Sequence, residues 1–250
     1  MENINLYYIT IVGFLSLIAF SMLLILRGLK LTLKRTEFSN QKQNKIFFQG
    51  VFVVLFWLGL TGILSAFGVL EMNEQKPVIP PPLLVLVNIP LIVLLFFINL
   101  SKTVKEIIKV IPSHWLVYFQ SFRIVVEILL WLLFVQNLLP IQMTFEGKNF
   151  DILVGILAIP AGYFVAKQTS IKAKKKLLIA WNIFGLCVLA IIVSIAVLSA
   201  PLPIRYFMNE PSSKVVSTFP FVWLPTVLVV IAYSLHILSL KQAFLIKEKS

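Results

Sequence analysis

The chain has few acidic and polar residues, and this shortage excludes a soluble globular protein. Only 13% of its 250 residues are charged, and just ten of them are Asp or Glu, while 59% are hydrophobic. The mean hydropathy is +0.96. A chain with so little polar sequence cannot cover the surface of a soluble globule. The sequence therefore predicts an integral membrane protein.

The chain also lacks a second cysteine and any long polar segment. Because Cys187 is the single cysteine, no intrachain disulfide can form. The longest stretches between apolar runs, 27–46 and 201–218, are too short to hold a core of their own. No soluble domain is expected, so any functional site should lie in the helices or in the short loops.

Several motifs of membrane enzymes and receptors are missing. The sequence has no His-Glu-x-x-His, no Gly-x-Ser-x-Gly with a partnered histidine, no paired-glutamate metal motif and no aspartate-rich diphosphate motif. The last apolar run has no lysine for a retinal Schiff base, and the Pro-Gln motif of seven-helix sugar transporters is absent. These absences make an enzyme the less favoured class.

What the sequence does contain is a series of long apolar runs. A helix needs roughly 20 apolar residues to cross about 30 Å of hydrocarbon. Seven runs approach this length, near 6–26, 47–70, 82–100, 114–139, 152–166, 177–200 and 219–240. The predicted fold is all-α, a polytopic transmembrane bundle of seven helices that forms one domain over residues 1–250.

The basic residues alternate between the gaps, which predicts the orientation. Every second gap and the C-terminal tail together hold seventeen of the 22 Lys and Arg residues: Arg27, Lys30, Lys34, Arg35, Lys42, Lys45, Lys102, Lys105, Lys109, Lys167, Lys172, Lys174, Lys175, Lys176, Lys241, Lys247 and Lys249. The opposite gaps hold only Lys76, Lys148, Arg205 and Lys214. Since Lys and Arg are retained on the cytoplasmic side, the N-terminus with Glu2 should be outside and Ser250 inside.

The net charge of +12 does not indicate nucleic-acid binding. The densest basic segment, Lys172 to Lys176, has no interleaved aromatic residues and sits in a short gap between two apolar runs. Cytoplasmic retention and attraction to anionic lipid headgroups explain it. The short loops and the abundance of Ile, Lys and Asn indicate a bacterial plasma membrane.

The fourth run carries the only charged side chains within apolar sequence. Gln120, Arg123 and Glu127 fall within about 60° of each other on one helix face, and Glu127 is close to the middle of the run. A charge at this depth costs from about 3 to over 10 kcal/mol if it faces lipid, so the stripe should point into the bundle.

This polar stripe has two interpretations. At a spacing of i, i+4, Arg123 and Glu127 can pair and stabilise the bundle. Alternatively the stripe is a functional site, since ionisable groups in membranes often mark proton or ion paths. Polar residues at matching depth that could join it are Tyr163, Asn182 and Tyr233.

The outer loop after the fourth run is a second candidate. The following run has fifteen uncharged residues, which span about 22 Å and fall short of the hydrocarbon core. Either the bilayer thins around this run, or the loop is recessed, with Glu146 screened by protein and Asn149 or Asp151 capping the next helix. A recessed loop would line an outward-facing pocket. The alternative is an ordinary interfacial turn anchored by Phe145 and Phe150.

The two histidines allow a further alternative. His114 and His236 both lie near the cytoplasmic ends of their runs, as a bis-histidine haem between helices would require. An interfacial or hydrogen-bonded role is more common for such residues, and no cofactor or metal is expected.

The segments Gln120-Ser-Phe-Arg-Ile-Val-Val-Glu127 and Met143-Thr-Phe-Glu-Gly-Lys-Asn-Phe-Asp-Ile152 resemble uncharacterised bacterial integral membrane proteins. The resemblance implies no activity. The favoured function is a transporter-like or sensory bundle that uses the polar stripe and the outer loop. The alternatives are an intramembrane redox protein that binds haem or quinone, an enzyme acting on a lipid-soluble substrate, or a subunit of a larger membrane complex.

Overall fold

The computed structural model describes residues 2–73, 75 and 78–245. Lys76, Lys247, Lys249 and Ser250, which entered the orientation argument, lie outside the described residues. Within the described part all regular elements are helices, and there is no strand. The prediction of an all-α membrane protein is thereby confirmed, since six helices are long and apolar enough to cross a membrane.

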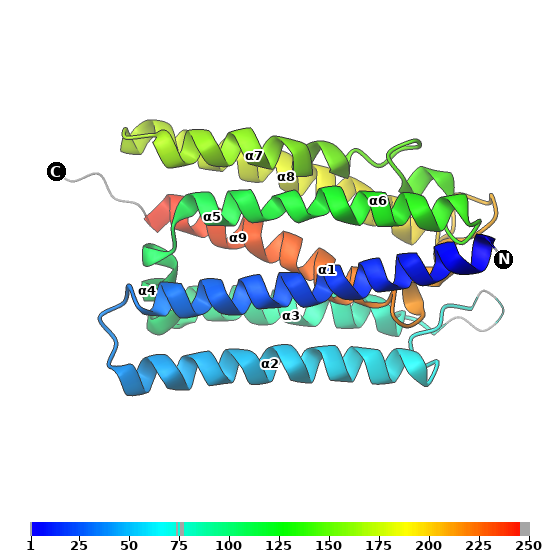
Figure 1. The fold of residues 1–250 in the computed structure, drawn as a ribbon, viewed down its shortest axis with the longest axis horizontal. Coiled ribbons are helices and arrows are strands. Elements are labelled where there is room, and N and C mark those ends of the chain that lie inside the picture. The colour runs from blue at the N-terminus through cyan, green and yellow to red at the C-terminus, as the bar shows by residue number, and fades with distance from the viewer. Residues whose placement is uncertain (1, 74, 76–77, 246–250) are drawn as a thin grey trace.

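The long helices run side by side along one axis (Figure 1). They are α1 (Glu2–Leu33), α2 (Asn40–Ala66), α3 (Pro82–Leu100), the segment from α5 (Ser113–Tyr118) through η1 (Phe119–Ser121) to α6 (Phe122–Val135), α7 (Asp151–Lys167), α8 (Ile171–Leu198), and η4 (Leu224–Val229) continued by α9 (Val230–Leu245). At 17 residues α7 is the shortest of these and is not among the six candidate spans.

The predicted runs and the helices differ mainly at their ends. α1 continues to Leu33, past the end of its apolar run, and α2 begins at Asn40, before its apolar run starts. Both helices therefore extend into the basic gap between them. The fourth run ends as a helix at Val135, where Asn137 takes a left-handed turn with φ 56°. The last helix begins at Leu224 rather than near 219 and opens with a π-helical stretch that contains Pro225.

One helix was not predicted. α4 (Lys102–Val110) is short and amphipathic, with Ile108 buried and Lys109 exposed. It lies at the end of the bundle that also holds the α1–α2 and α7–α8 connections (Figure 1). Serine side chains cap three helices that start at this end, since Ser39, Ser101 and Ser170 each accept a backbone N–H of the first turn.

The core is formed by α5, η1, α6, η4 and α9, with α1, α3, α7 and α8 packed around them. Phe14 of α1 meets Phe221 edge-to-face at 5.2 Å. On α7, a Cβ at Gly155 would lie 2.8 Å from the backbone nitrogen of Ile124, and one at Gly162 would lie 2.6 Å from the ring of Tyr118. Glycine at both positions therefore lets α7 approach α5 and α6 closely.

Candidate functional site

The polar side chains of the fourth run all point into the bundle. Gln120, Arg123 and Glu127 are at most 1% exposed. They lie on η1 and α6, where these elements meet the start of α7 and the middle of α9. Charged groups are tolerated at such a position only if the protein supplies partners.

Arg123 finds its partner on another helix. Its Nε donates to Asp151 Oδ2 at 2.8 Å, and its Nη2 lies 2.7 Å from Asp151 Oδ1. The pairing with Glu127 expected from the i, i+4 spacing is therefore not the one formed. Asp151 is the first residue of α7, so the ion pair joins the start of this helix to α6.

Asn149 connects the second carboxylate to the same helix start. Its Nδ2 lies 2.7 Å from both carboxyl oxygens of Glu127 and also donates to the carbonyl of Met143. Its Oδ1 accepts the backbone N–H of Asp151 at 2.9 Å. One buried amide side chain thus holds Glu127 and satisfies an N–H group at the N-terminus of α7, where such groups have no partner within the helix.

His236 extends the network into α8 and α9. Its Nε2 lies 3.4 Å from Arg123 Nη1, and its Nδ1 lies 2.9 Å from Asn182 Oδ1. Asn182 Nδ2 donates to Ser239 Oγ at 2.8 Å. These contacts fit a neutral imidazole that donates from Nδ1 and accepts from Arg123 at Nε2.

The approach of α8 to His236 depends on a glycine. A Cβ at Gly185 would lie 2.2 Å from Cε1 and 2.3 Å from Nε2 of the His236 ring. Because the ring is also bonded to Asn182 and Arg123, it cannot turn aside without losing these bonds.

The charges of this network do not balance. It holds one guanidinium, which stays charged in proteins, and two carboxyl groups, those of Glu127 and Asp151. The guanidinium is bonded to Asp151, while the oxygens of Glu127 are bonded to the uncharged amide of Asn149. Glu127 is therefore the group that carries the excess negative charge when both carboxyls are ionised.

Other candidate residues have separate surroundings. Gln120 donates to the carbonyl of Ala232 on α9. Glu146 is exposed and accepts a hydrogen bond from Trp131 Nε1 at 2.9 Å. Of the three outer-loop residues predicted to line a pocket, Asn149 and Asp151 are therefore buried, whereas Glu146 lies on the surface. Tyr163 is 52% exposed, and Tyr233 is half-buried against the apolar core.

The histidines do not fit a haem site. The ring of His114 packs edge-on against Trp115 and Tyr118, whereas both ring nitrogens of His236 have protein partners. An axial ligand needs a free ring nitrogen. Among the described residues no group of three or more His, Cys, Asp or Glu side chains could hold a metal ion.

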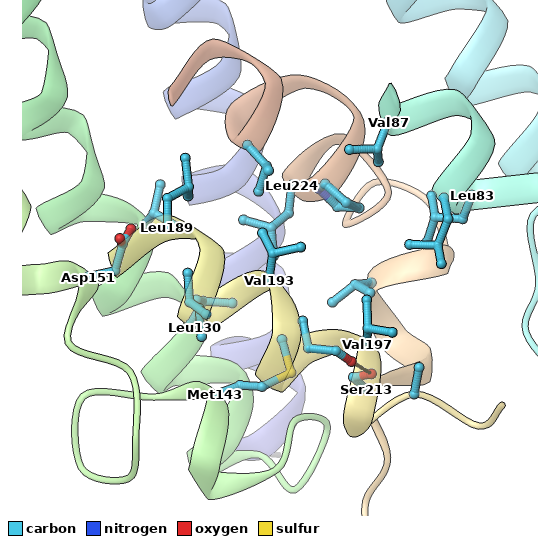
Figure 2. A pocket seen from close by; sticks show the side chains of 18 of the residues that line it. Leu83, Val87, Leu130, Met143, Asp151, Leu189, Val193, Val197, Ser213 and Leu224 are labelled. Carbon is cyan, nitrogen blue, oxygen red and sulfur yellow. Dashed lines mark hydrogen bonds between the residues drawn. The ribbon is translucent and has the colours of Figure 1, made fainter. Parts of the chain in front are cut away.

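A cavity of about 110 Å³ lies beside the network, and Glu127 and Asp151 are part of its wall. Figure 2 shows Asp151 and Leu189 at one side of it and Leu83 and Val87 of α3 at the other. Nearly all the remaining lining residues are aliphatic. A carboxylate that reaches an apolar cavity is a common arrangement in small-molecule sites.

The sequence did not reveal the whole network. His236 was expected to be an interfacial or hydrogen-bonded residue, with a haem ligand as the alternative. It is hydrogen-bonded, but its partners were not predicted, and Ser239 was missed. Ala232, His236, Ser239 and Ala243 are all buried, and their spacing of three or four residues places them on one face of α9. This small and polar face was a usable signal for close contact with another helix.

Comparison with known proteins gives the family. No curated protein and no solved structure matches the chain. A family model described as "Domain of unknown function (DUF8737)" matches residues 80–244. The match runs from just before α3 to the last turn of α9 and includes every residue of the buried network. The chain therefore belongs to the DUF8737 family.

Proposed function

We propose that the chain crosses the bacterial plasma membrane seven times, with the N-terminus outside and the C-terminus inside. The basic connections α1–α2 and α7–α8, together with α4, lie at one end of the bundle (Figure 1), which agrees with the positive-inside rule. α7 counts as the fifth span in this proposal, and its 17 residues, about 25 Å of helix, cover less than a full hydrocarbon core.

Reporter fusions at both termini test this topology. A reporter that works only in the cytoplasm should be active at the C-terminus and inactive at the N-terminus. Activity of a periplasmic reporter at the C-terminus would contradict the proposal. An anionic lipid surface is the partner proposed for the basic end, because Lys and Arg near a membrane are attracted to anionic headgroups.

We further propose that the protein is transporter-like and that Glu127 is its proton-exchanging group. The observation that carries this is the charge imbalance of the buried network, two carboxyl groups against one guanidinium. A net negative charge in a low-dielectric interior is costly, so the network takes up a proton or another cation. Asp151 already has Arg123, and the proton therefore belongs on Glu127.

Infrared difference spectroscopy of the purified protein tests the proton on Glu127. A protonated carboxyl group absorbs apart from an ionised one, so a pH titration should reveal a buried carboxyl band that disappears in Glu127→Gln. Glu146→Gln is the matched control, because this exposed carboxylate lies outside the network. A band that persists in Glu127→Gln, or no such band in the native protein, would contradict the proposal.

A sensory role would use the same proton site, with protonation changing the contact between Glu127 and Asn149 instead of driving transport. Transport is favoured because the proton site adjoins a cavity that can hold a second molecule.

A further inference from the structure

The cavity beside Glu127 lies between two helices that pack on other partners. α3 packs on α4, η4 and α9, and α8 packs on α7 and α9. The cavity fills the space between them, with Leu83 and Val87 on the side of α3 and Val193 and Ala196 on the side of α8. Figure 2 shows Val87 and Leu83 facing Val193 and Leu224 across this space. A molecule in the cavity would thus touch helices that face the lipid.

The chemistry of the lining selects an aliphatic occupant. Among the described residues that line the cavity there is no aromatic side chain, so a flat aromatic cation would find no ring to stack on. Apolar cavities of this kind stay dry and bind apolar groups, and one of about 150 Å³ holds benzene. A volume of about 110 Å³ suits a slender alkyl group better than a ring system.

The carboxyl groups at one end of the cavity determine whether a cation or an anion can bind there. The titratable and charged groups around Glu127 are Arg123 on α6, Asp151 on α7, and His236 and Tyr233 on α9. The wall from α3 and the part of α8 that lines the cavity contribute no charge. With Arg123 bonded to Asp151, an anion would meet the unbalanced carboxylate, whereas a cation would neutralise it.

We propose that this cavity binds an aliphatic organic cation whose charge lies beside Glu127 and whose alkyl chain lies among the residues of α3 and α8. The proposal rests on the proposed function, because the cation takes the place of the proton on Glu127. One Glu127 cannot serve both at once, so binding of the cation releases the proton. Because the proton and the cation exclude each other at Glu127, their movements are coupled, as in an exchange transporter. The proposed substrate class is an amphiphilic cation.

Proton release on ligand addition tests the proposal directly. The probe is n-propyltrimethylammonium, which is short enough for a cavity of about 110 Å³, carries a permanent charge and has no proton of its own to donate. The protein is placed in nanodiscs of zwitterionic phosphatidylcholine in weak buffer with a pH indicator. Near neutral pH we expect about one proton released per bound cation, and n-propanol should release none.

Variants of α8, each with a matched control, test whether the cation binds in this cavity, and variants of Glu127 and Glu146 test which carboxyl group releases the proton. Ala196→Phe fills the cavity and should weaken binding about tenfold or more, whereas Ala190→Phe, on the exposed side of the same helix, should not. Glu127→Gln should abolish proton release, while Glu146→Gln should leave it unchanged. Raising the pH until Glu127 is ionised should remove the release and strengthen binding.

The outcomes separate this proposal from the one on which it rests. If the infrared band of Glu127 is present but the cation binds no better than n-propanol, or binds equally to Ala196→Phe, the substrate class is wrong and the proton site stands. If the infrared band is absent, the proton site itself fails. Binding that is blocked by Ala196→Phe but releases no proton also overturns the exchange.

Discussion

α2 and the α5–α6 segment are both apolar enough to cross a membrane, yet they have opposite positions in the bundle. In the most apolar stretch of α2 only 11% of the residues are buried, against 56% in the segment from α5 to α6. α2 lies at the edge in Figure 1 and packs chiefly on α1, whereas α6 packs on α1 and α7. Apolarity alone therefore does not decide which helix becomes the centre.

The difference lies in polar and small residues. Lipid chains are as apolar as leucine, so helices in a membrane associate through close packing and hydrogen bonds rather than through the hydrophobic effect. α2 is held by Trp57 Nε1, which donates to the carbonyl of Thr226, by Ser65 Oγ, which donates to that of Ser217, and by Trp223 Nε1, which donates to that of Leu58. α6 is held by an ion pair and by the network that continues through His236.

The strongest test of this contrast removes the cation of the network. Arg123→Leu should lower the free energy of unfolding by about 3–5 kcal/mol, because it leaves the buried carboxylate of Asp151 without its counter-ion. Chemical or thermal unfolding in detergent measures the loss. The double variant Arg123→Leu with Asp151→Leu should recover much of it.

A double-mutant cycle then identifies the partner of Arg123. We expect a larger coupling energy between Arg123 and Asp151 than between Arg123 and Glu127, because only the first pair is in direct contact. Equal coupling, or strictly additive effects for Arg123 and Asp151, would show that the ion pair does not form.

A glycine-to-alanine substitution should have opposite effects beside the buried network and on α2. Gly185→Ala on α8 should destabilise by about 1–3 kcal/mol, because its Cβ meets the fixed ring of His236. Gly59→Ala on α2 has open space around its Cβ and should stabilise by up to about 1 kcal/mol through helix propensity. The same unfolding assay compares them, and destabilisation by both would remove the contrast between the two helices.

Glu127→Gln should change stability by less than about 1 kcal/mol. The amide resembles the protonated carboxyl group, and its oxygen can still accept from Asn149 Nδ2. This variant should therefore be much milder than Arg123→Leu in the same assay. A loss as large as that of Arg123→Leu would mean that Glu127 is ionised and needed as a counter-ion.

The smallest effect should come from the ion pair between the buried side chain of Arg205 and the exposed Glu210. A hydrogen bond from the Arg205 guanidinium lowers the pKa of Glu210 below its usual value of 4.5. A group with a lowered pKa stabilises the fold above that value, and the gain is lost as the pH falls through the lowered pKa. Because Glu210 is 72% exposed, the gain is slight and is screened by salt. Glu210→Gln should therefore reduce the melting temperature slightly at neutral pH, and should have no effect at a pH below the lowered pKa, where Glu210 is protonated in the folded and unfolded states alike.

The sequence predicted the helices better than their contacts. α3 was predicted at its observed ends, because proline at its start and Ser101 at its end are strong boundary signals. α4 was missed, since nine residues with three lysines resemble an ordinary basic gap. The amphipathic pattern of α4 becomes visible only when Ile107 and Ile108 are placed together on one face of a helix.

The burial of the polar stripe followed from the cost of charge in lipid, but its partners did not. Pairing at i, i+4 is visible within one helix, while Arg123 and Asp151 are 28 positions apart, and nothing in the sequence gives the packing of α7 on α6. The shortness of the fifth run did predict that residues near Asp151 are screened by protein, and Asn149 and Asp151 are buried. It did not indicate which side chain they would meet.

The ion pair between α6 and the first residue of α7 also bears on how the chain enters the membrane. An arginine near the centre of a single helix disfavours insertion by about 2.5–3.5 kcal/mol, and α7 alone is short. We expect the two helices to leave the translocon together as a hairpin, with Asp151 neutralising Arg123 before either meets lipid. Glycosylation-based insertion assays should show that residues 110–170 insert more efficiently than residues 110–140, and that Asp151→Ala removes much of this advantage.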